Sequence, residues 1–427
     1  MLWNLKVENF GRIKSADIKV SPMMIFIGDN NSGKSYLMSL LWGLQTEDFH
    51  RFLNDECFIY PKYTASRKVV HEIITNKSMN GKISADGRNK ILAFFNVVLN
   101  KNLDKILKNI FNSEVKCTSI EITTADTEDI TLNQGNLKKL RDDLKSVKES
   151  NTEKFYLHIM IDFAREILFK DFMFDKTQYY NPLFLPASRT GFMLTYKTLI
   201  NESLNQHFGG TSNDASRFTK PIIRFLNNLV SLSEEPNNEF SDVIEYIEKE
   251  LIKGKVVKDN SPVKNIYYKS EGMNEEIPLY LTSSLVTEVS SLLLFLEDKN
   301  SHFKTLIIEE PEAHLHLKAQ AMMAKILVMI LNKNKNVWLT THSDTFFQQL
   351  NNLIKYKNLP NRLEMMQKFG ISESELLDIE KVKVYQFDAL FDKTVVTEIE
   401  PSDSGFAGNT FNSVIDSIMH EVIELDG

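Results

Sequence analysis

The chain has little cysteine and no long apolar run. Cys57 and Cys117 are its only cysteines in 427 residues, and they lie far apart. Two unclustered cysteines indicate a reducing compartment and predict no metal knuckle. The longest apolar stretches, residues 91–99 and 324–331, are too short to span a bilayer, and no basic, apolar leader opens the sequence. We therefore expect a cytoplasmic protein with no signal peptide and no membrane partner.

Positive charge is also not in excess. The chain carries 50 Lys and Arg against 57 Asp and Glu, a net charge of −7, which argues against a dedicated nucleic-acid coat protein. Two local basic runs, at residues 138–148 and 253–264, are interpreted as solvated faces, with a DNA-binding groove as the alternative. Apolar residues make up 42% of the chain and charged residues 25%, as in ordinary globular proteins, and we find no internal repeat.

A phosphate-binding pattern stands near the start. Residues 28–35 read GDNNSGKS, between an apolar run of strand type at 23–27 and an apolar segment of helical spacing at 35–44. Glycines let backbone N–H groups approach phosphate oxygens, and the helix N-terminus adds positive potential. We expect Lys34 to reach the β- and γ-phosphates and Ser35 to hold magnesium. The alternative is a glycine turn before an ordinary helix. The expected nucleotide-binding residues of this P-loop are Gly28, Asn30, Asn31, Ser32, Gly33, Lys34, Ser35 and Tyr36.

An acidic strand end appears in the C-terminal third. Residues 305–312 read TLIIEEPE, a buried type of strand that ends in two adjacent carboxylates. This is the form of a Walker B element, which places acidic residues beside a P-loop. We expect Glu309 to bind magnesium and Glu310 to polarise the attacking water; the alternative is a helix-capping pair. His314 and His316 follow, but no third ligand lies at a suitable spacing for a metal site.

A third strand, at residues 337–341, ends in a polar turn that carries His342. One helical segment, residues 317–332, separates it from the acidic strand. A crossover of this size makes the two strands parallel neighbours. We therefore expect His342 to lie close to Glu310 and to the γ-phosphate, in a catalytic role.

Together these elements resemble the Walker A, Walker B and switch-histidine motifs of ABC-type ATPases. More narrowly, they are similar to the SMC/RecF/OLD-like branch with its AAA_15 and AAA_21 ATPases, as is the opening LKVENFGRI at residues 5–13. The resemblance implies an α/β fold, namely an ABC-type P-loop ATPase head with mainly helical insertions. It also implies ATP and Mg²⁺ as cofactors, with Lys34, Glu310 and His342 as catalytic residues.

That family has a signature helix, for which residues 283–297 are the best candidate. The resemblance implies that Ser284 binds the γ-phosphate held by a partner subunit, in a homo-oligomer closed around ATP. Leu285 and Val286 replace the usual two glycines, in a form similar to that of prokaryotic defence ATPases. The alternative is a serine N-cap on a core helix. Residues 183–191 also resemble that group, and Arg189 is interpreted either as a phosphate or Q-loop contact or as a structural salt bridge.

These motifs divide the chain. We expect the ATPase core at residues 1–44, 181–190 and 269–427, with helical insertions at 45–180 and 191–268. The first insertion is expected to contain one strand pair, around residues 115–123 and 130–132. The tail is expected to form strands at 382–385 and 394–399 and a helix at 411–422.

Neither insertion has the long heptad run of an SMC protein, and the tail lacks the acidic spacing of a TOPRIM nuclease. The leading hypothesis is an ATPase without its own nuclease, a sensor or scaffold of an anti-phage defence system similar to PARIS or Septu. It would control a separate effector protein, a nuclease or toxin. The alternatives are a RecF-like DNA repair ATPase, with DNA as its partner, and a scaffold that binds ATP but hydrolyses it slowly.

Overall fold

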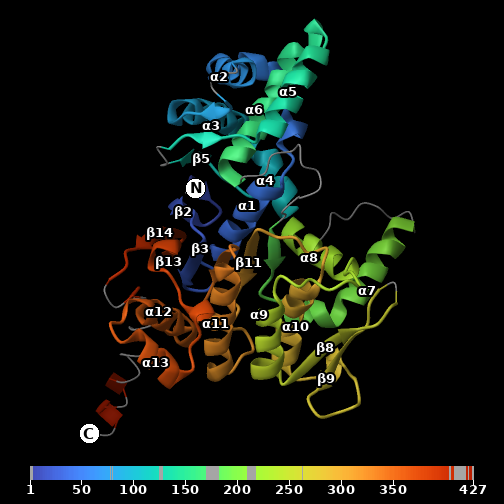
Figure 1. Ribbon diagram of the computed structural model, residues 1–427, viewed down its shortest axis with the longest axis vertical. Helices are drawn as coiled ribbons and strands as arrows, with labels where there is room; N and C mark the ends of the chain where they lie inside the picture. The colour runs from blue at the N-terminus through green and yellow to red at the C-terminus, as the bar shows by residue number, and fades with distance from the viewer. Residues whose placement is uncertain are drawn as a thin grey trace. The chain divides into compact units, whose positions relative to one another are not determined.

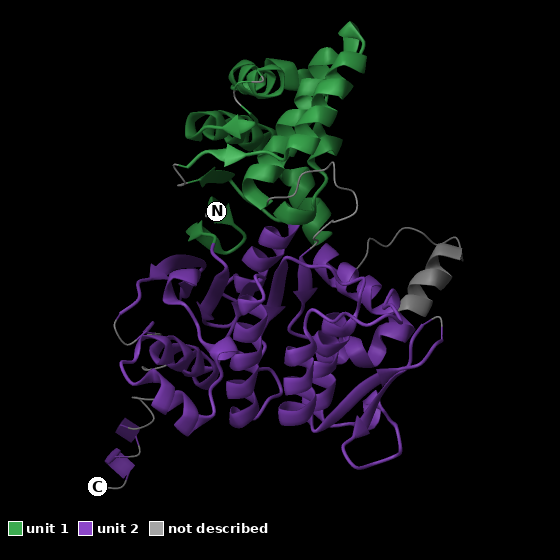
Figure 2. Ribbon diagram, in the orientation of Figure 1, with its two compact units in different colours: residues 1–20, 44–180 green, residues 21–43, 181–427 purple. Residues whose placement is uncertain are grey.

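The computed structural model describes residues 3–76, 78, 80–124, 128–169, 182–208, 218–261, 263–402, 405–407, 420–421 and 423–425. The chain divides into two compact units (Figure 2). Unit 1 comprises residues 1–20 and 44–180, and unit 2 comprises residues 21–43 and 181–427. Both units combine helices with β-sheet, so the α/β class is confirmed.

In the described part of unit 2, the main sheet has the strand order β14-β13-β3-β12-β11-β7. Neighbours from β13 to β7 are parallel, and β14 is antiparallel to β13. The strands are β3 (Met23–Gly28), β7 (Leu183–Leu185), β11 (Thr305–Glu309), β12 (Asn336–Thr340), β13 (Val382–Leu390) and β14 (Lys393–Ile399). The expected parallel pairing of the acidic strand with the strand before His342 is confirmed, with Glu309 opposite Thr340.

The central strands of this sheet are buried on both faces. Every residue of β3 and β11 is buried, as in parallel sheets that are covered on both sides. Met23, Ile25 and Ile27 alternate along β3 toward the main apolar core, which also contains Leu306 and Ile308 of β11. Because the strands from β13 to β7 are parallel, their carboxyl ends meet at one edge of this sheet.

Helices cover this sheet, and α11 packs against α12 and α9 (Figure 1). The helices of unit 2 are α1 (Lys34–Thr46, whose last residues belong to unit 1), α7 (Arg189–Phe208), α8 (Lys220–Val230), α9 (Ser241–Tyr246), α10 (Ser284–Glu297), α11 (Leu317–Asn332), α12 (Asp344–Asn358) and α13 (Arg362–Phe369). A second sheet has the order β10-β9-β8, from β8 (Gly254–Lys258), β9 (Ile266–Ser270) and β10 (Ile277–Pro278).

Unit 1 combines an antiparallel sheet with helices. Strand β1 (Trp3–Phe10) pairs with β2 (Ile13–Lys19) on one side and with β5 (Ser119–Thr124) on the other. Two short strands, β4 (Lys82–Ile83) and β6 (Ile130–Thr131), pair with each other. The helices are α2 (Tyr63–Thr75), α3 (Ala85–Lys101), α4 (Leu103–Phe111), α5 (Gln134–Ser146) and α6 (Thr152–Phe169).

Two details differ from the sequence-based expectations. The strands expected at residues 115–123 and 130–132 both form, but they do not pair with each other, because β5 joins β1 and β6 joins β4. The segment 191–268, expected to be helical, also contains β8 and part of β9. Most of the helix expected at 411–422 lies outside the described residues. None of the helices in the described part of the chain has both the length and the apolar composition that spanning a bilayer requires.

Candidate active site

The loop after β3 has the backbone that its glycines permit. Gly28 has φ 129° and Gly33 has φ 99°, values that L side chains rarely adopt. A Cβ atom at Gly28 would lie 2.3 Å from the carbonyl oxygen of Phe387 on the neighbouring β13. Asn31 lies in the left-handed region with φ 59°. The chain therefore turns within six residues from the end of β3 to Lys34, the first residue of α1.

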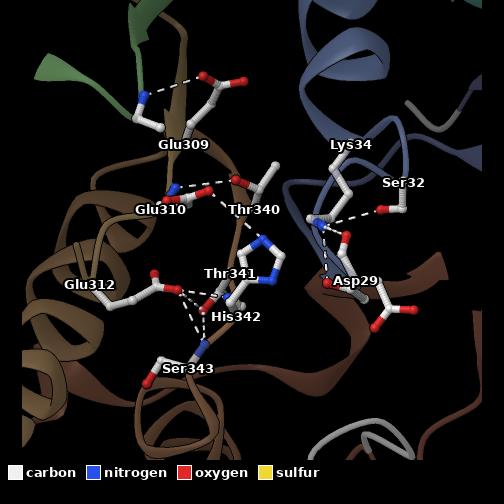
Figure 3. Close-up of polar contacts among 12 residues, drawn as sticks. Asp29, Ser32, Lys34, Glu309, Glu310, Glu312, Thr340, Thr341, His342 and Ser343 are labelled. Carbon is white, nitrogen blue, oxygen red and sulfur yellow. Dashed lines mark hydrogen bonds and ion pairs between the residues drawn. The ribbon is translucent and has the colours of Figure 1, made fainter. Parts of the chain in front are cut away.

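Lys34 is held over this loop by three hydrogen bonds. Its Nζ donates to the carbonyl oxygens of Gly28 (3.0 Å) and Asp29 (2.6 Å) and to the hydroxyl of Ser32 (3.2 Å) (Figure 3). All three ammonium protons thus have partners. Burial lowers the pKa of Lys34 to about 8, although the Glu310, Asp29 and Glu312 carboxylates oppose this shift. The loop therefore carries a desolvated cation beside the acidic strand end.

The other P-loop residues expected at the nucleotide lie around this cation. Ser32 is buried and binds Lys34, whereas Asn30 and Asn31 are exposed on the loop. Ser35 and Tyr36 are exposed on the first turn of α1, and the Tyr36 side chain is 48% exposed. The helix N-terminus and the loop N–H groups suit this surface to a phosphate chain.

Glu309 ends β11 as a buried carboxylate, 7% exposed. Its Oε2 accepts a hydrogen bond from the backbone N–H of Ala187 (3.2 Å). Its Oε1 is buried and makes no hydrogen bond among the described residues. Burial raises the pKa of Glu309, against the effect of the nearby Ser35 hydroxyl and the Ala187 N–H, which favour the charged form. A buried carboxylate oxygen without a partner, beside a serine hydroxyl, is a donor set that fits Mg²⁺.

Glu310 and His342 face each other at the ends of adjacent strands (Figure 3). His342 Nε2 lies 3.7 Å from Glu310 Oε1, and the two side chains are 29% and 40% exposed. Glu310 has φ 44°, an uncommon value for a residue with a side chain, and its N–H donates to both oxygens of Thr340, at 3.0 and 3.1 Å. The expected neighbourhood of Glu310 and His342 is thus present, and the turn that aims Glu310 is tied to β12.

Burial and the Lys34 ammonium lower the pKa of His342 below its ordinary value of 6.5, with Glu310 as the largest opposing influence. The lowered pKa favours the neutral imidazole, in which one ring nitrogen can accept a hydrogen bond. The separation of 3.7 Å from Glu310 is too long for a hydrogen bond, so both groups remain able to contact a reacting molecule.

Glu312 clamps the turn that carries His342, a role that sequence reasoning missed. Its Oε1 accepts hydrogen bonds from the Thr341 hydroxyl (2.7 Å), the His342 N–H (2.6 Å) and the Ser343 N–H (3.2 Å). Glu312 is 8% exposed, and burial raises its pKa despite these donors. Its place in the motif EEPE was visible in the sequence, but its direction toward β12 was not.

Arg189 is a buried structural residue rather than a phosphate contact. It is 1% exposed and forms an ion pair with Glu288 of α10. Its guanidinium also donates to the carbonyl oxygens of Glu309 (2.6 Å), Glu310 (3.0 Å) and Pro186 (3.2 Å). Of the two interpretations left open by the sequence, the structure supports the salt bridge.

Ser284 is the first residue of α10 and is exposed, outside the described network around Lys34 and Glu310. The N-cap is Ser283, whose hydroxyl accepts a hydrogen bond from the N–H of Val286 (3.4 Å). The capping role therefore belongs to Ser283, and Ser284 is left at the surface.

His316 caps α11 through the N–H of Ala319. In the described part of the chain, no cluster of three or more His, Cys, Asp or Glu side chains is placed to hold a metal.

The arrangement can bind and cleave a phosphoanhydride. The P-loop and Lys34 supply positive potential at the end of β3, while Glu310 and His342 stand at the ends of β11 and β12 at the same edge. A carboxylate beside a buried cation at a P-loop is an arrangement that can serve phosphoryl transfer to water.

Weak similarity to solved structures accompanies these features. An SMC head bound to the C-winged helix domain of ScpA is 12% identical with TM-score 0.38, covering 93% of this chain and 98% of that chain. The SMC head domain from Thermotoga maritima is 10% identical with TM-score 0.36, covering 93% and 99%. An SMC head with an extended coiled coil, bound to the C-terminal domain of ScpA and derived from Pyrococcus furiosus, is 12% identical with TM-score 0.35, covering 100% and 99%.

No curated protein matches the chain. In contrast, the family model described as "AAA ATPase domain" (AAA_15) matches residues 1–347, which is most of the chain and includes the P-loop, Glu309, Glu310 and His342. The protein is therefore an ATPase that belongs to the AAA_15 family of AAA ATPase domains.

Proposed function

We propose that this protein is an ABC-type ATPase in which Lys34 binds the β- and γ-phosphates, Glu310 orients the attacking water and His342 contacts the γ-phosphate. Ser35 and Glu309 would hold Mg²⁺, which supplies charge neutralisation on the phosphates. The observation that carries this proposal is the approach of Glu310 Oε1 to His342 Nε2, 3.7 Å apart, at the strand ends beside the buried Lys34.

We also propose that two copies close around ATP, with Ser284 of each meeting the γ-phosphate bound by the other. Ser284 is exposed at the N-terminus of α10, a helix of 14 residues, where free N–H groups favour anions. Val286, which stands in place of a glycine, is 5% exposed and belongs to the apolar core. Its side chain is therefore directed away from the surface on which Ser284 lies.

The biological role that we propose is that of a cytoplasmic sensor or scaffold in an anti-phage defence system, which holds a separate nuclease or toxin effector. This step rests on the resemblance of the signature segment and of residues 183–191 to defence ATPases. It is also supported by the distribution of the site: the residues assigned to ATP chemistry all belong to unit 2, which leaves unit 1 available for a partner.

The test is affinity purification of the wild type, Lys34→Ala and Glu310→Gln from cells that carry the native gene neighbourhood. A defence ATPase should retain a co-encoded protein, and the amount retained should differ between the two variants because they differ in nucleotide state. Absence of any co-purified protein, together with ATP-dependent and salt-sensitive binding of duplex DNA by the lone chain, would favour the RecF-like alternative.

A further inference from the structure

The Arg189–Glu288 ion pair joins the start of the signature helix to the catalytic strand end. Arg189 and Glu288 are 1% and 0% exposed at their side chains, and Thr190 donates a further hydrogen bond to Glu288. Glu288 lies on α10, four residues after Ser284, which is about one helical turn. The pair is thus close to the exposed end of the helix but wholly inside the protein.

The Arg189 guanidinium also donates hydrogen bonds to the main chain of Glu309 and Glu310. Nη1 donates to the carbonyl oxygen of Glu309 at 2.6 Å, and Nη2 donates to that of Glu310 at 3.0 Å. Glu310 has a left-handed backbone conformation, φ 44°, which sets the direction of its side chain. The guanidinium of Arg189 holds the carbonyl groups on both sides of this residue in place. A planar guanidinium fixes several acceptors in one geometry, which an ammonium cannot do.

We propose that Arg189 and Glu288 are positioning residues that transmit the position of α10 to Glu310. Arg189 contacts Glu288 of α10 and the carbonyl oxygens of Glu309 and Glu310 at the same time, so a movement of α10 is passed to the end of β11. A displacement of α10 by an anion at Ser284 then changes the alignment of Glu310 in the same subunit. We call this coupling of α10 to Glu310 through Arg189 and Glu288 the relay. The relay rests on the proposed closure of two copies around ATP, because that closure brings the anion to Ser284.

A double-mutant cycle on ATP turnover tests the relay. The variants are Ser284→Ala, Glu288→Gln and the double variant, with Arg189→Lys as a conservative change that keeps the charge but loses the planar fork. Glu375→Gln is the matched control, because Glu375 is also buried at 2% exposure and accepts a backbone N–H, from Ser372 at 2.7 Å. Each variant is first checked for binding of a labelled ATP analogue, which shows that the nucleotide site is folded.

The relay predicts that Ser284→Ala and Glu288→Gln each lower kcat by roughly 5–150-fold, the usual range of coupling between sites, with KM nearly unchanged. The double variant should be no slower than the slower single variant, because both changes interrupt one path. Arg189→Lys should behave like Glu288→Gln, and Glu375→Gln should keep the wild-type kcat.

Two results overturn the relay in distinguishable ways. If the two single effects multiply in the double variant, or if Glu288→Gln keeps the wild-type kcat while Ser284→Ala loses it, the relay is wrong and the closure around ATP stands. If Ser284→Ala has no effect on kcat, the closure itself is wrong, and the relay fails with it.

Discussion

Replacing Glu312 should separate catalysis from nucleotide binding. Its Oε1 is the shared acceptor for the Thr341 hydroxyl and for the N–H groups of His342 and Ser343, at 2.6–3.2 Å. Hydrogen bonds to a charged group are worth about 1.5–3 kcal/mol each. Glutamine keeps an acceptor oxygen but loses the negative charge, so Glu312→Gln weakens these three hydrogen bonds and costs the turn roughly 1.5–3 kcal/mol. Glu312→Ala leaves all three donors without this acceptor.

The consequence for the reaction follows from the position of His342. A misplacement of about 1 Å at a catalytic group can lower the rate about a hundredfold. We therefore expect kcat to fall on the order of tenfold in Glu312→Gln and a hundredfold in Glu312→Ala. Binding of ATP should change little, since the P-loop contacts of Lys34 do not involve this carboxylate as a hydrogen-bond partner.

The assay is steady-state phosphate release, with affinity for a labelled ATP analogue and thermal unfolding measured in parallel. Glu375→Gln serves as the control for loss of a buried glutamate that caps a turn. If a Glu312→Ala protein folds, binds the analogue and hydrolyses ATP at the wild-type kcat, Glu312 does not hold His342 in its catalytic position.

Three further outcomes are expected. Lys34→Ala removes the buried cation and should weaken ATP binding on the order of a hundredfold, measured by titration with a labelled analogue; unchanged affinity would contradict the P-loop assignment. Glu309→Gln should raise the Mg²⁺ concentration needed for half-maximal turnover, and an identical Mg²⁺ dependence in both proteins would exclude Glu309 as a ligand. The pKa of Lys34 is lowered to about 8, and the neutral amine must regain a proton to bind phosphate. ATP affinity should therefore be constant below pH 8 and fall by up to about tenfold per pH unit above it. A constant ATP affinity through alkaline pH would count against this role of Lys34.

The parts of the site that could be predicted from the sequence are those set by local pattern. The P-loop needs glycines at fixed spacing between a strand and a helix, and the structure has β3, Gly28 and α1 in that order. A run of apolar residues followed by two carboxylates also indicated β11 and the position of Glu309 and Glu310. The short crossover through α11 predicted the parallel neighbour that brings His342 to Glu310.

The parts that could not be predicted depend on contacts between distant segments. Strand β5 pairs with β1, more than a hundred residues earlier in the chain, and no local signal specifies that register. Similarly, the bond from Glu312 to the turn at His342 and the ion pair between Arg189 and Glu288 join different elements through side-chain direction. Sequence spacing alone does not determine which way such side chains point.

The proposed function depends above all on Glu310, which we propose orients the water that attacks ATP. The most direct measurement is single-turnover hydrolysis of radiolabelled ATP by Glu310→Gln, with nucleotide binding measured on the same preparation. We expect wild-type binding and hydrolysis slower by about two orders of magnitude or more, because the amide keeps the size of the side chain but loses the charge that orients and activates water. Hydrolysis at the wild-type rate in this variant would show that Glu310 does not orient the water.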